Sequence, residues 1–355
     1  MKKVYTVTFQ RALNYGAVLQ AYALMKFLKA RNFDVEVLDY APSYFLLQTY
    51  RPAKGLQKSI DKYKKFHKFK DFRTKFMTLT PNTYYSLNAL NKLPAGHAAI
   101  CGSDQIWNLN LTKQKFDPVF FLDFVKGATK RIAFAASAGS IRLNDFAPLV
   151  KKTLESFDSI GVRESILAED VKEIAPDTHP VVVVDPCLLI QDYSEVFDDS
   201  RIPSGDFIVS YVVGSGEMLE CFNDRIKEFK KHYDIPVIHI GAKAISAADI
   251  SILDIGPSDW ITFIKRAKYV VTNSFHGTAF SINFEKNFIF IPHVISNLNT
   301  RQTTLLKSIG LMDRMLKSDD VMTDNKISDI DYKKITPILN DLVSKSQDFI
   351  IESLK

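Results

Sequence analysis

The stretch that decides the fold runs from residue 269 to residue 284, Tyr269-Val-Val-Thr-Asn-Ser-Phe-His-Gly-Thr-Ala-Phe-Ser-Ile-Asn-Phe284. Its β-rich, apolar start predicts a buried strand, and a helical pattern follows from residue 278 to 285. Between them lie four polar or small residues, Asn273, Ser274, His276 and Gly277. Open α/β sheets place ligands where the carboxyl end of a strand meets a helix, and the helix start attracts anions. The stretch therefore predicts an α/β fold with a candidate site at His276, a residue that exchanges protons near neutral pH.

A structural interpretation of the same residues also stands. Asn and Ser are common helix caps, and a histidine beside them often binds nearby carbonyl groups without any catalytic role. Other polar residues near such a junction would favour a functional site over a simple helix cap, so the rest of the chain bears on the choice.

Strands and helices alternate along the chain. The expected strands are residues 4–9, 35–39, 98–101, 131–135, 160–163, 181–185, 207–213, 237–240 and 269–272. The expected helices include residues 17–30, a segment ending near 233, one that opens at 256–258 with Ser258 as its cap, and 330–354. This alternation predicts mainly parallel sheets flanked by helices, and the polar stretch 191–206 is the expected linker between two such series.

Length and cysteine content narrow the class of protein. The chain has 355 residues, of which 46% are apolar, enough for two domains of ordinary size. Its three cysteines are far apart and form no CxxC or Cys/His cluster, which favours a reducing compartment over a disulfide framework or a zinc site. No apolar run reaches the roughly 18 residues of a membrane span, and the start lacks the apolar region of a signal peptide. We therefore expect a cytoplasmic protein.

The formal charge of +6 is concentrated in one segment. Between Tyr50 and Phe76 there are ten Lys or Arg residues against Asp61 and Asp71, so this segment carries +8 and the remainder −2. Its apolar residues recur at helical spacing, which predicts a basic amphipathic helix at about residues 54–76. Such a helix fits a membrane surface or an anionic acceptor, or it lies on the core with a solvated lysine face. No recognised motif accompanies the charge, so nucleic acid is not an expected partner.

Four strand-to-helix turns carry the remaining polar signals. The first is Asn14-Tyr15-Gly16, and the second is the loop Cys101 to Asn108, which gathers Ser103, Asp104, Gln105, Trp107 and Asn108. The third is Gly214-Ser215-Gly216, a weak resemblance to a phosphate-binding turn, and the fourth is the His276 junction. The loop from 101 to 108 suits hydrogen bonding to a sugar, and it equally suits a plain capped turn.

Three of these turns, all but Gly214–Gly216, lie in a set of six motifs that stand in the order seen in one family. The motifs are Asn14-Tyr-Gly-Ala-Val-Leu-Gln-Ala-Tyr-Ala-Leu24, Gly102-Ser-Asp-Gln-Ile-Trp-Asn108, Ala136-Ser-Ala-Gly139, Val162-Arg-Glu164, Asp185-Pro-Cys-Leu-Leu189 and Asn273-Ser-Phe-His-Gly277. Over about residues 1 to 315 the chain resembles the polysaccharide pyruvyl transferase family. Several family members carry an Arg two residues before the motif His, where this chain has Ser274, so that anion contact is either missing or supplied elsewhere.

The resemblance implies two Rossmann-like domains facing a cleft, similar to the GT-B glycosyltransferase architecture. The first, residues 1–195, is expected on the acceptor side and includes the basic helix. The second, residues 206–325, is expected on the donor side, and residues 326–355 form a helix that packs back across both. The implied activity transfers pyruvate from phosphoenolpyruvate to a sugar diol, giving a ketal on a capsular or other exopolysaccharide or its precursor. Phosphoenolpyruvate is a co-substrate, and no cofactor or metal is expected.

The residues can be given roles in this chemistry. His276 is the expected proton donor to the methylene carbon of the donor, and Asp104 the expected base for the sugar hydroxyl. Donor binding is expected from residues that hold anions: Arg163, Arg301, Ser274, Gly277, Gly214 and Gly216. Acceptor binding is expected from Asn14, Tyr15, Gly16, Gln105, Trp107 and Asn108. An ordinary ion pair of Arg163 with Glu164 or Glu169 is the alternative for that residue.

Two other functions fit the same sequence. A nucleotide-sugar glycosyltransferase would use the Gly214–Gly216 turn and the His276 helix start for a diphosphate. A peripheral carbohydrate- or membrane-binding protein would use the basic helix and no chemistry. Fold similarity cannot separate these functions.

Overall fold

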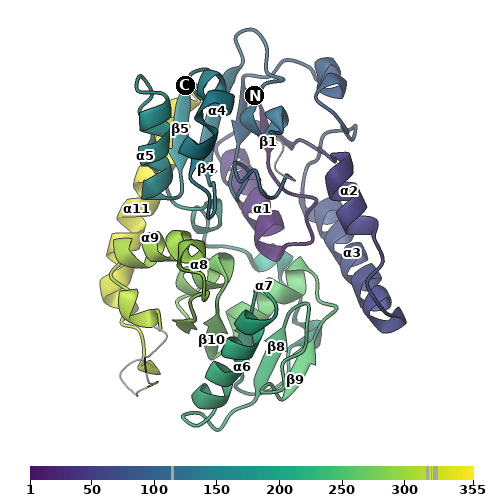
Figure 1. The fold of residues 1–355 in the computed structure, drawn as a ribbon, viewed down its shortest axis with the longest axis vertical. Helices are drawn as coiled ribbons and strands as arrows, with labels where there is room; N and C mark the ends of the chain where they lie inside the picture. The colour runs from purple at the N-terminus through teal and green to yellow at the C-terminus, as the bar shows by residue number, and fades with distance from the viewer. Residues whose placement is uncertain (113–115, 317–319, 321, 323–326) are drawn as a thin grey trace. The chain divides into compact units, whose positions relative to one another are not determined.

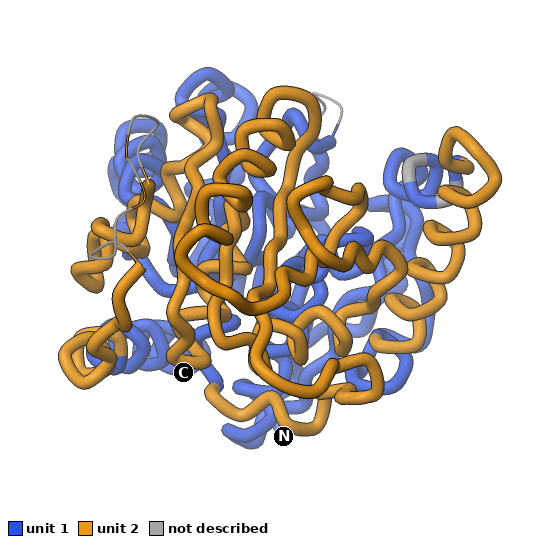
Figure 2. The backbone as a smooth tube through the Cα atoms, turned by 90° about the horizontal axis from the view of Figure 1, so that it is seen from below, with its two compact units in different colours: residues 1–51, 73–190, 340–355 blue, residues 52–72, 191–339 orange. Residues whose placement is uncertain are grey.

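Two parallel sheets organise the chain in a computed structural model that describes residues 1–112, 116–316, 320, 322 and 327–355 (Figure 1). The structure divides into two compact units, which Figure 2 shows in separate colours. Unit 1 comprises Met1–Arg51, Arg73–Ile190 and Asn340–Lys355, and unit 2 comprises Pro52–Phe72 and Gln191–Leu339. The expected domain boundary at 325–326 lies outside the described residues.

Unit 1 contains a six-stranded sheet in the order β2-β1-β3-β4-β5-β6, with every neighbouring pair parallel. Its strands are β1 (Lys3–Val7), β2 (Asp34–Val37), β3 (Ala98–Cys101), β4 (Lys130–Ala136), β5 (Ser159–Val162) and β6 (Val181–Val182). The central strands are short apolar runs such as Ala98-Ala-Ile-Cys101, buried along their whole length. Such strands are apolar at every position because helices and loops cover both faces of a parallel sheet.

The helices of unit 1 connect successive strands. They are α1 (Tyr15–Lys29), α2 (Ser43–Tyr50), α4 (Ala147–Leu154) and α5 (Ser165–Ile174). Helix α1 is buried from Tyr15 to Met25, and it begins where the side chain of Asn14 accepts the backbone N–H of Ala17 at 3.2 Å. A cap of this kind satisfies one of the donors left open by a helix start.

Unit 2 repeats the arrangement with a five-stranded parallel sheet in the order β11-β10-β7-β8-β9. Its strands are β7 (Ile208–Tyr211), β8 (Val237–Ile240), β9 (Ile250–Ile252), β10 (Tyr269–Thr272) and β11 (Asn287–Phe290). Its helices are α3 (Leu56–Phe76, of which residues 56–72 belong to this unit), α6 (Glu217–Phe229), α7 (Pro257–Arg266), α8 (Phe275–Asn283) and α9 (Thr300–Ser308). Residues from β7, α6, β8 and β10 build one apolar core.

Each sheet has one point where the strand order reverses direction. In unit 1 the chain moves from β1 outward to β2, and then returns to place β3 on the other side of β1. In unit 2 it moves from β7 to β8 and β9, and then returns to place β10 on the other side of β7. Crevices for ligands in open α/β sheets form at such switch points, outside the carboxyl ends of the strands. The loops after β1 and β3, and those after β7 and β10, therefore hold the favoured positions.

The units differ from the sequence-based boundaries in two places. The first 17 residues of α3, Leu56 to Phe72, group with unit 2, although the basic helix was expected in the first domain. The ammonium of Lys68 binds the Asp259 carboxylate of α7 at 2.8 Å, which ties the helix to this unit. The last helix, α11 (Tyr332–Ser353), begins in unit 2, and from Asn340 onward its residues belong to unit 1.

Two helix starts also differ from expectation. Helix α8 begins at Phe275, three residues earlier than the periodicity indicates, because Ser274 caps it. Helix α7 is capped at Gly256 and not at Ser258, since the Asp259 side chain accepts the Gly256 N–H at 2.7 Å and Pro257 occupies the first helical position. In the described part of the chain, no helix combines the length and apolar character needed to cross a bilayer.

Candidate functional site

The β10–α8 junction of unit 2 is held by short-range hydrogen bonds from its own polar residues. The Ser274 hydroxyl accepts the Gly277 N–H at 3.3 Å and so caps α8. The Thr272 hydroxyl accepts the Ser274 N–H at 3.0 Å and donates to the Tyr211 carbonyl of the neighbouring strand at 2.7 Å. The carboxyl ends of β7 and β10 are thereby fixed against each other, with the helix start placed between them.

Asn273 makes the second link across this switch point. Its side-chain oxygen accepts the Val213 N–H at 2.7 Å, and its side-chain nitrogen donates to the Val213 carbonyl at 2.8 Å. Val213 leads directly into Gly214 and Gly216, which have φ angles of +135° and +58°. Glycine adopts these angles without strain. Because β7 and β10 are neighbours in the sheet, the Gly214–Gly216 turn and the His276 junction lie at adjacent strand ends.

Gly277 permits the close approach of α8 to β10. A Cβ at this position would lie 2.6 Å from the Thr272 hydroxyl oxygen and 3.0 Å from its methyl carbon. No side chain fits there without moving the helix start. Gly277 therefore has a packing role that places the first turn of α8, in addition to any role of its N–H group.

His276 lies in that first turn and is 5% exposed. Its ring packs edge-on against Phe275, with centroids 5.3 Å apart, and the Arg301 guanidinium lies 5.9 Å from the Phe275 ring centroid. The amide of Gln302, the next residue on α9, donates to the Asn273 carbonyl at 3.5 Å. Helix α9 thus brings Arg301 to the same cluster as His276, a juxtaposition of an imidazole, a guanidinium and a helix start that suits an anionic ligand.

The corresponding region of unit 1 is a buried polar network after β1 and β3. The Thr8 hydroxyl donates to the Ser103 carbonyl at 2.9 Å, and the Gln20 amide donates to the Thr8 hydroxyl at 2.8 Å and accepts the Ser103 N–H at 3.2 Å. Gly102, at φ +123°, admits no Cβ, because one would lie 2.0 Å from the Phe134 carbonyl oxygen. A hydrogen bond to Gln20 of α1 and close packing on Phe134 of β4 therefore fix the position of Gly102 and Ser103.

Arg163 lies inside this network and not on an exposed surface. It is 4% exposed, and its guanidinium binds the Asp185 carboxylate at 2.6 Å, while the Ser103 hydroxyl donates to the same carboxylate oxygen at 2.7 Å. Burial lowers the pKa of Arg163, but the charges of Asp185, Glu164 and Asp104 outweigh it and raise the pKa above its ordinary value. The partner is thus Asp185, where the sequence suggested Glu164 or Glu169, and the pair is buried.

Gln105 and Asn108 form the outer part of the loop. The Asn108 amide donates to the Gln105 side-chain oxygen at 2.8 Å. A Cβ on Gly139, from the third motif, would lie 2.0 Å from that oxygen, so the glycine allows the two loops to touch. Asp104 adopts φ +70°, and its carboxylate accepts the Gln105 N–H at 2.8 Å. The side chains of Gln105 and Asn108 are thus in contact within one loop.

Four of the expected acceptor-binding residues are buried or cap a helix. Trp107 is fully buried, stacks on Phe121 with centroids 5.3 Å apart and donates its indole N–H to the Phe120 carbonyl, so it belongs to the core. Tyr15 is also buried in α1, with Gly16 beside it. Asn14 alone of that turn is exposed, and its side chain is the helix cap. Trp107 and Tyr15 fill the core because a large aromatic side chain stabilises most when it leaves water.

Sequence reasoning missed several residues that build these sites. Asp185 lies in one of the six motifs, but no functional role was predicted for it, although it is the charge partner of Arg163. No role was predicted for Thr8, Gln20 or Gln302, and Asn273, a candidate helix cap, instead binds the Val213 backbone. A signal did exist for Asp185, because a lone acidic residue directly after an apolar strand is unusual without a partner.

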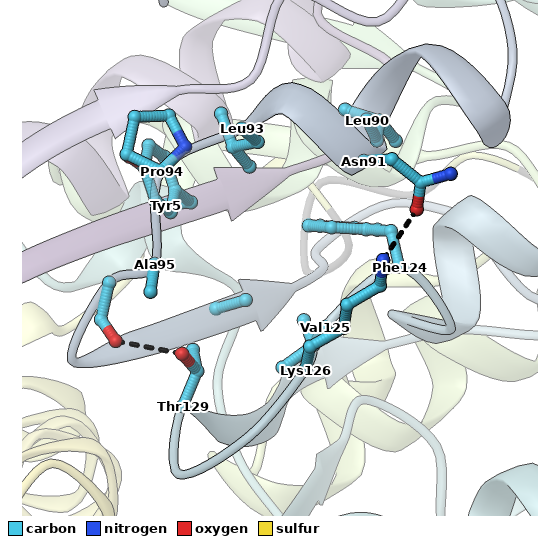
Figure 3. Close-up of a pocket in the computed structure, with 12 residues that line it drawn as sticks. Tyr5, Leu90, Asn91, Leu93, Pro94, Ala95, Phe124, Val125, Lys126 and Thr129 are labelled. Carbon is cyan, nitrogen blue, oxygen red and sulfur yellow. Dashed lines mark hydrogen bonds between the residues drawn. The ribbon is translucent and has the colours of Figure 1, made fainter.

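A cavity elsewhere in unit 1 lies away from these residues. It measures about 180 Å³ and is lined mainly by apolar groups near the amino ends of β1, β3 and β4, including Tyr5, Leu93 and Phe124 (Figure 3). Because the strands are parallel, this cavity lies at the edge of the sheet opposite to the motif loops. Among the described residues no group of three or more His, Cys, Asp or Glu is arranged to hold a metal ion.

Comparison with solved structures shows the fold. The chain is similar to Staphylococcus aureus MnaA in a structure with UDP, with 12% identity, 98% of this chain and 91% of that chain covered, and a TM-score of 0.53. It is also similar to the UDP-GlcNAc 2-epimerase of Neisseria meningitidis bound to UDP-GlcNAc, with 10% identity, 100% and 99% coverage and a TM-score of 0.51. A glycosyltransferase of kitacinnamycin matches with 13% identity, 100% and 99% coverage and a TM-score of 0.50. The fold is therefore α/β with two Rossmann-like domains of the GT-B type.

Comparison with curated proteins finds no match. The sequence profile of a family described as "Polysaccharide pyruvyl transferase" matches residues 14–293. This range begins at the Asn14 cap of unit 1 and ends beyond the His276 junction of unit 2, so it includes both switch-point loops.

Proposed function

Because this chain belongs to the polysaccharide pyruvyl transferase family, we propose that it transfers pyruvate from phosphoenolpyruvate to two hydroxyl groups of a sugar. The product is a cyclic ketal on a capsular or other cell-surface polysaccharide or its precursor. The observation that carries the proposal is the family match over residues 14–293, which spans both polar junctions. We place the reaction in the cytoplasm, at the inner face of the membrane that carries the acceptor.

The proposed chemistry has a definite balance of atoms. A proton adds to the methylene carbon of phosphoenolpyruvate, and a sugar hydroxyl, losing its proton to a base, adds to the neighbouring carbon. The C–O bond to phosphate then breaks, inorganic phosphate leaves, and the second hydroxyl attacks the same carbon and loses its proton. No net oxidation or reduction occurs, so the reaction needs no redox cofactor, and we propose that it uses phosphoenolpyruvate as co-substrate without a metal.

Unit 2 supplies the groups that suit the donor. His276 is the proposed proton source, since its imidazole lies in the first turn of α8, beside the N–H groups proposed to hold the donor. The start of α8, with the N–H groups near Ser274 and Gly277, and the Gly214–Gly216 turn are proposed to hold the phosphate. Arg301, which packs on Phe275 beside His276, is the proposed replacement for the Arg that other family members carry at position 274.

Unit 1 supplies the groups that suit the acceptor. Asp104 is the proposed base for the sugar hydroxyl, with Gln105 and Asn108 as hydrogen-bonding partners of the sugar. Arg163 donates hydrogen bonds to Asp185 and to Ser103, and Ser103 lies at the start of this loop. We therefore propose that Arg163 is a positioning residue and not a direct contact of the donor.

A nucleotide-sugar glycosyltransferase is the second candidate. The structural neighbours named above include proteins determined with UDP or UDP-GlcNAc. In such an enzyme the Gly214–Gly216 turn and the start of α8 would bind a diphosphate in place of phosphoenolpyruvate. The family match favours pyruvyl transfer, because the similarity to these structures rests on 10–13% identity and reflects the fold.

Two measurements on the purified protein test the proposal. Incubation with phosphoenolpyruvate and a panel of free and lipid-linked glycans should give a product heavier by one pyruvate less one water, with phosphate released in equal amount. Thermal unfolding should shift upward with phosphoenolpyruvate and not with UDP- or GDP-sugars, because a ligand stabilises the fold by RT ln(1 + [L]/Kd). A shift with a nucleotide sugar and transfer of its sugar would establish the second candidate instead.

A further inference from the structure

Helix α3 has two apolar faces, and only one of them is buried. At about 100° per residue, Leu56, Ile60 and Tyr63 fall within roughly 60° of one another around the helix. They are 80%, 39% and 65% exposed. Phe69 and Phe72, on the opposite side, are buried. One face therefore packs within the protein, and the other presents three large apolar side chains to solvent, which is unusual for a face without a partner.

Some lysines of α3 contact the protein and others are exposed, and exposed Lys58 and Lys75 lie away from the outward apolar face. Lys68 binds Asp259 at 2.8 Å and packs on Gly256, so it faces inward. Lys65 also faces inward, since it lies 5.5 Å from the Phe69 ring centroid and burial lowers its pKa to about 8. Lys64 and Lys70 are exposed and flank the outward apolar face, and exposed Lys54 precedes its first residue. Within the described residues, no carboxylate forms an ion pair with these three exposed lysines.

This combination selects one class of partner. An acidic polysaccharide or nucleic acid needs cations but no row of exposed aliphatic and aromatic side chains. A bilayer surface needs both, because apolar groups enter the boundary between headgroups and acyl chains while lysines reach the anionic headgroups. Tyr63 suits that boundary, since its ring is apolar and its hydroxyl polar.

We propose that the outward face of α3 docks on an anionic lipid bilayer. Leu56, Ile60 and Tyr63 insert at the headgroup boundary, and Lys54, Lys64 and Lys70 bind the headgroups. The charge of the whole +8 segment does not act as one unit, because Lys65 and Lys68 are committed to the protein's own structure. This inference goes beyond the proposed pyruvyl transfer, and each can fail without the other.

Co-sedimentation of the full-length protein with lipid vesicles tests the proposal. Wild-type protein should sediment with phosphatidylcholine vesicles that contain phosphatidylglycerol, less with phosphatidylcholine alone, and less at high salt. Replacing Lys54, Lys64 and Lys70 with Gln should lower the affinity on the order of 100-fold at low salt, because each lysine near an anionic surface contributes a factor of about five. Replacing Leu56, Ile60 and Tyr63 with Ser should lower it by roughly tenfold or more.

Matched variants control for charge and for surface apolarity. Lys172→Gln, Lys307→Gln and Lys333→Gln together remove the same charge from exposed sites elsewhere, and should retain vesicle binding. Leu149→Ser, Ile250→Ser and Ile338→Ser remove side chains that are 48%, 50% and 45% exposed, and should also retain it. All variants should keep the same activity on a short soluble acceptor, which separates membrane docking from catalysis.

Three results would overturn the proposal. The wild-type protein fails to sediment with anionic vesicles at low salt, or the α3 variants sediment as well as the wild type. In the third, the protein binds an immobilised acidic polysaccharide and loses that binding in the lysine variant but not in the apolar one, while vesicles do not compete. That outcome would identify a polyanion as the partner of this face.

Discussion

The β5–α5 junction of unit 1 and the β10–α8 junction of unit 2 have the same local form with opposite chemistry. In each, two residues link a buried parallel strand to a helix, Arg163-Glu164 in unit 1 and Asn273-Ser274 in unit 2. The first pair is charged and buried, with Arg163 on Asp185 and Glu164 accepting a hydrogen bond from Ser137. The second pair is neutral: Asn273 binds the backbone of Val213, which follows β7, and Ser274 binds the backbone of α8.

The difference in charge between the two junctions indicates which of them can bind an anion. A guanidinium that already holds a carboxylate at 2.6 Å, inside the protein, is committed to the fold. A helix start capped by a serine keeps its positive dipole end and carries no carboxylate between Thr272 and Gly277. We therefore propose that the unit 2 junction binds the donor and that the unit 1 junction positions its loop. The variants below test that division in order of expected effect.

The largest effect is expected at His276. His276→Gln should lower turnover by about 10²–10⁴-fold, because the side chain can still form hydrogen bonds but no longer delivers a proton. Steady-state kinetics with phosphoenolpyruvate and a glycan acceptor measures this, alongside the melting temperature. His179→Gln, at an exposed site, is the control and should leave turnover unchanged. Wild-type turnover in His276→Gln would remove the histidine from the mechanism.

A large effect on stability is expected at Arg163. Arg163→Met should lower the free energy of unfolding by about 3–5 kcal/mol, since it leaves Asp185 charged, buried and without its guanidinium partner. Arg163→Met with Asp185→Leu should recover much of that loss. Urea denaturation measures both.

The exposed pair Arg266–Asp199 is the matched control for this prediction. Its atoms lie 2.8 Å apart, but both side chains are about half exposed, so Arg266→Met should cost about 0–1 kcal/mol. If Arg163→Lys folds with wild-type stability and raises the KM for phosphoenolpyruvate, Arg163 contacts the donor. The proposed division between the two junctions would then be wrong.

A smaller effect is expected from acid, and it acts on unit 2. His239 of β8 binds the Ser210 hydroxyl of β7 at 2.9 Å, and burial lowers the pKa of His239 to about 4. The unfolded chain takes up this proton below about pH 6.5 while the folded chain does not, so the stabilisation present at neutral pH is lost as the pH falls. The contribution of His239 should drop by about 2 kcal/mol between pH 7 and pH 5. His239→Gln should show a shallower decline in urea denaturation, and an equal slope would refute the buried neutral state.

The smallest effect is expected at the cap of α8. Ser274→Ala should lower the free energy of unfolding by about 1 kcal/mol, because the Gly277 N–H loses its acceptor. Ser274→Asp should restore stability but raise the KM for phosphoenolpyruvate, since it adds negative charge at the proposed anion site. Thermal unfolding and kinetics on both variants separate the cap from the charge. Equal KM values in the two variants would place the donor elsewhere.

Much of this fold was predictable from short-range patterns. Apolar runs such as 98–101 and 269–272 predicted buried strands, and the alternation with helices predicted parallel sheets, which the structure confirms. Strand β9 was not predicted because its three residues are partly exposed, and β11 was not predicted because its apolar run directly follows a helix. Short strands of this kind form because a neighbouring strand offers hydrogen bonds, which a local pattern does not reveal.

The site was predictable in position but less so in detail. The loops that hold Asp104 and His276 lie at the carboxyl ends of their strands, as their motifs indicate. The burial of Trp107 and the pairing of Arg163 with Asp185 depend on which segments the topology brings together. Likewise, the division of α3 into an inward and an outward face depends on where Asp259 lies. Those contacts join residues that are distant in sequence, so no local spacing encodes them.

The most direct test of the central claim is the wild-type reaction run in D2O with phosphoenolpyruvate and an accepting glycan. If a proton reaches the methylene carbon from a group that exchanges with solvent, as proposed for His276, the ketal methyl group should carry a single deuterium. Phosphate should appear in equal amount, and both signals should fall together in His276→Gln. Mass spectrometry of the glycan and a phosphate assay measure the two. A product without deuterium, or a glycan that instead gains a sugar from a UDP- or GDP-sugar, would contradict pyruvyl transfer at the unit 2 junction.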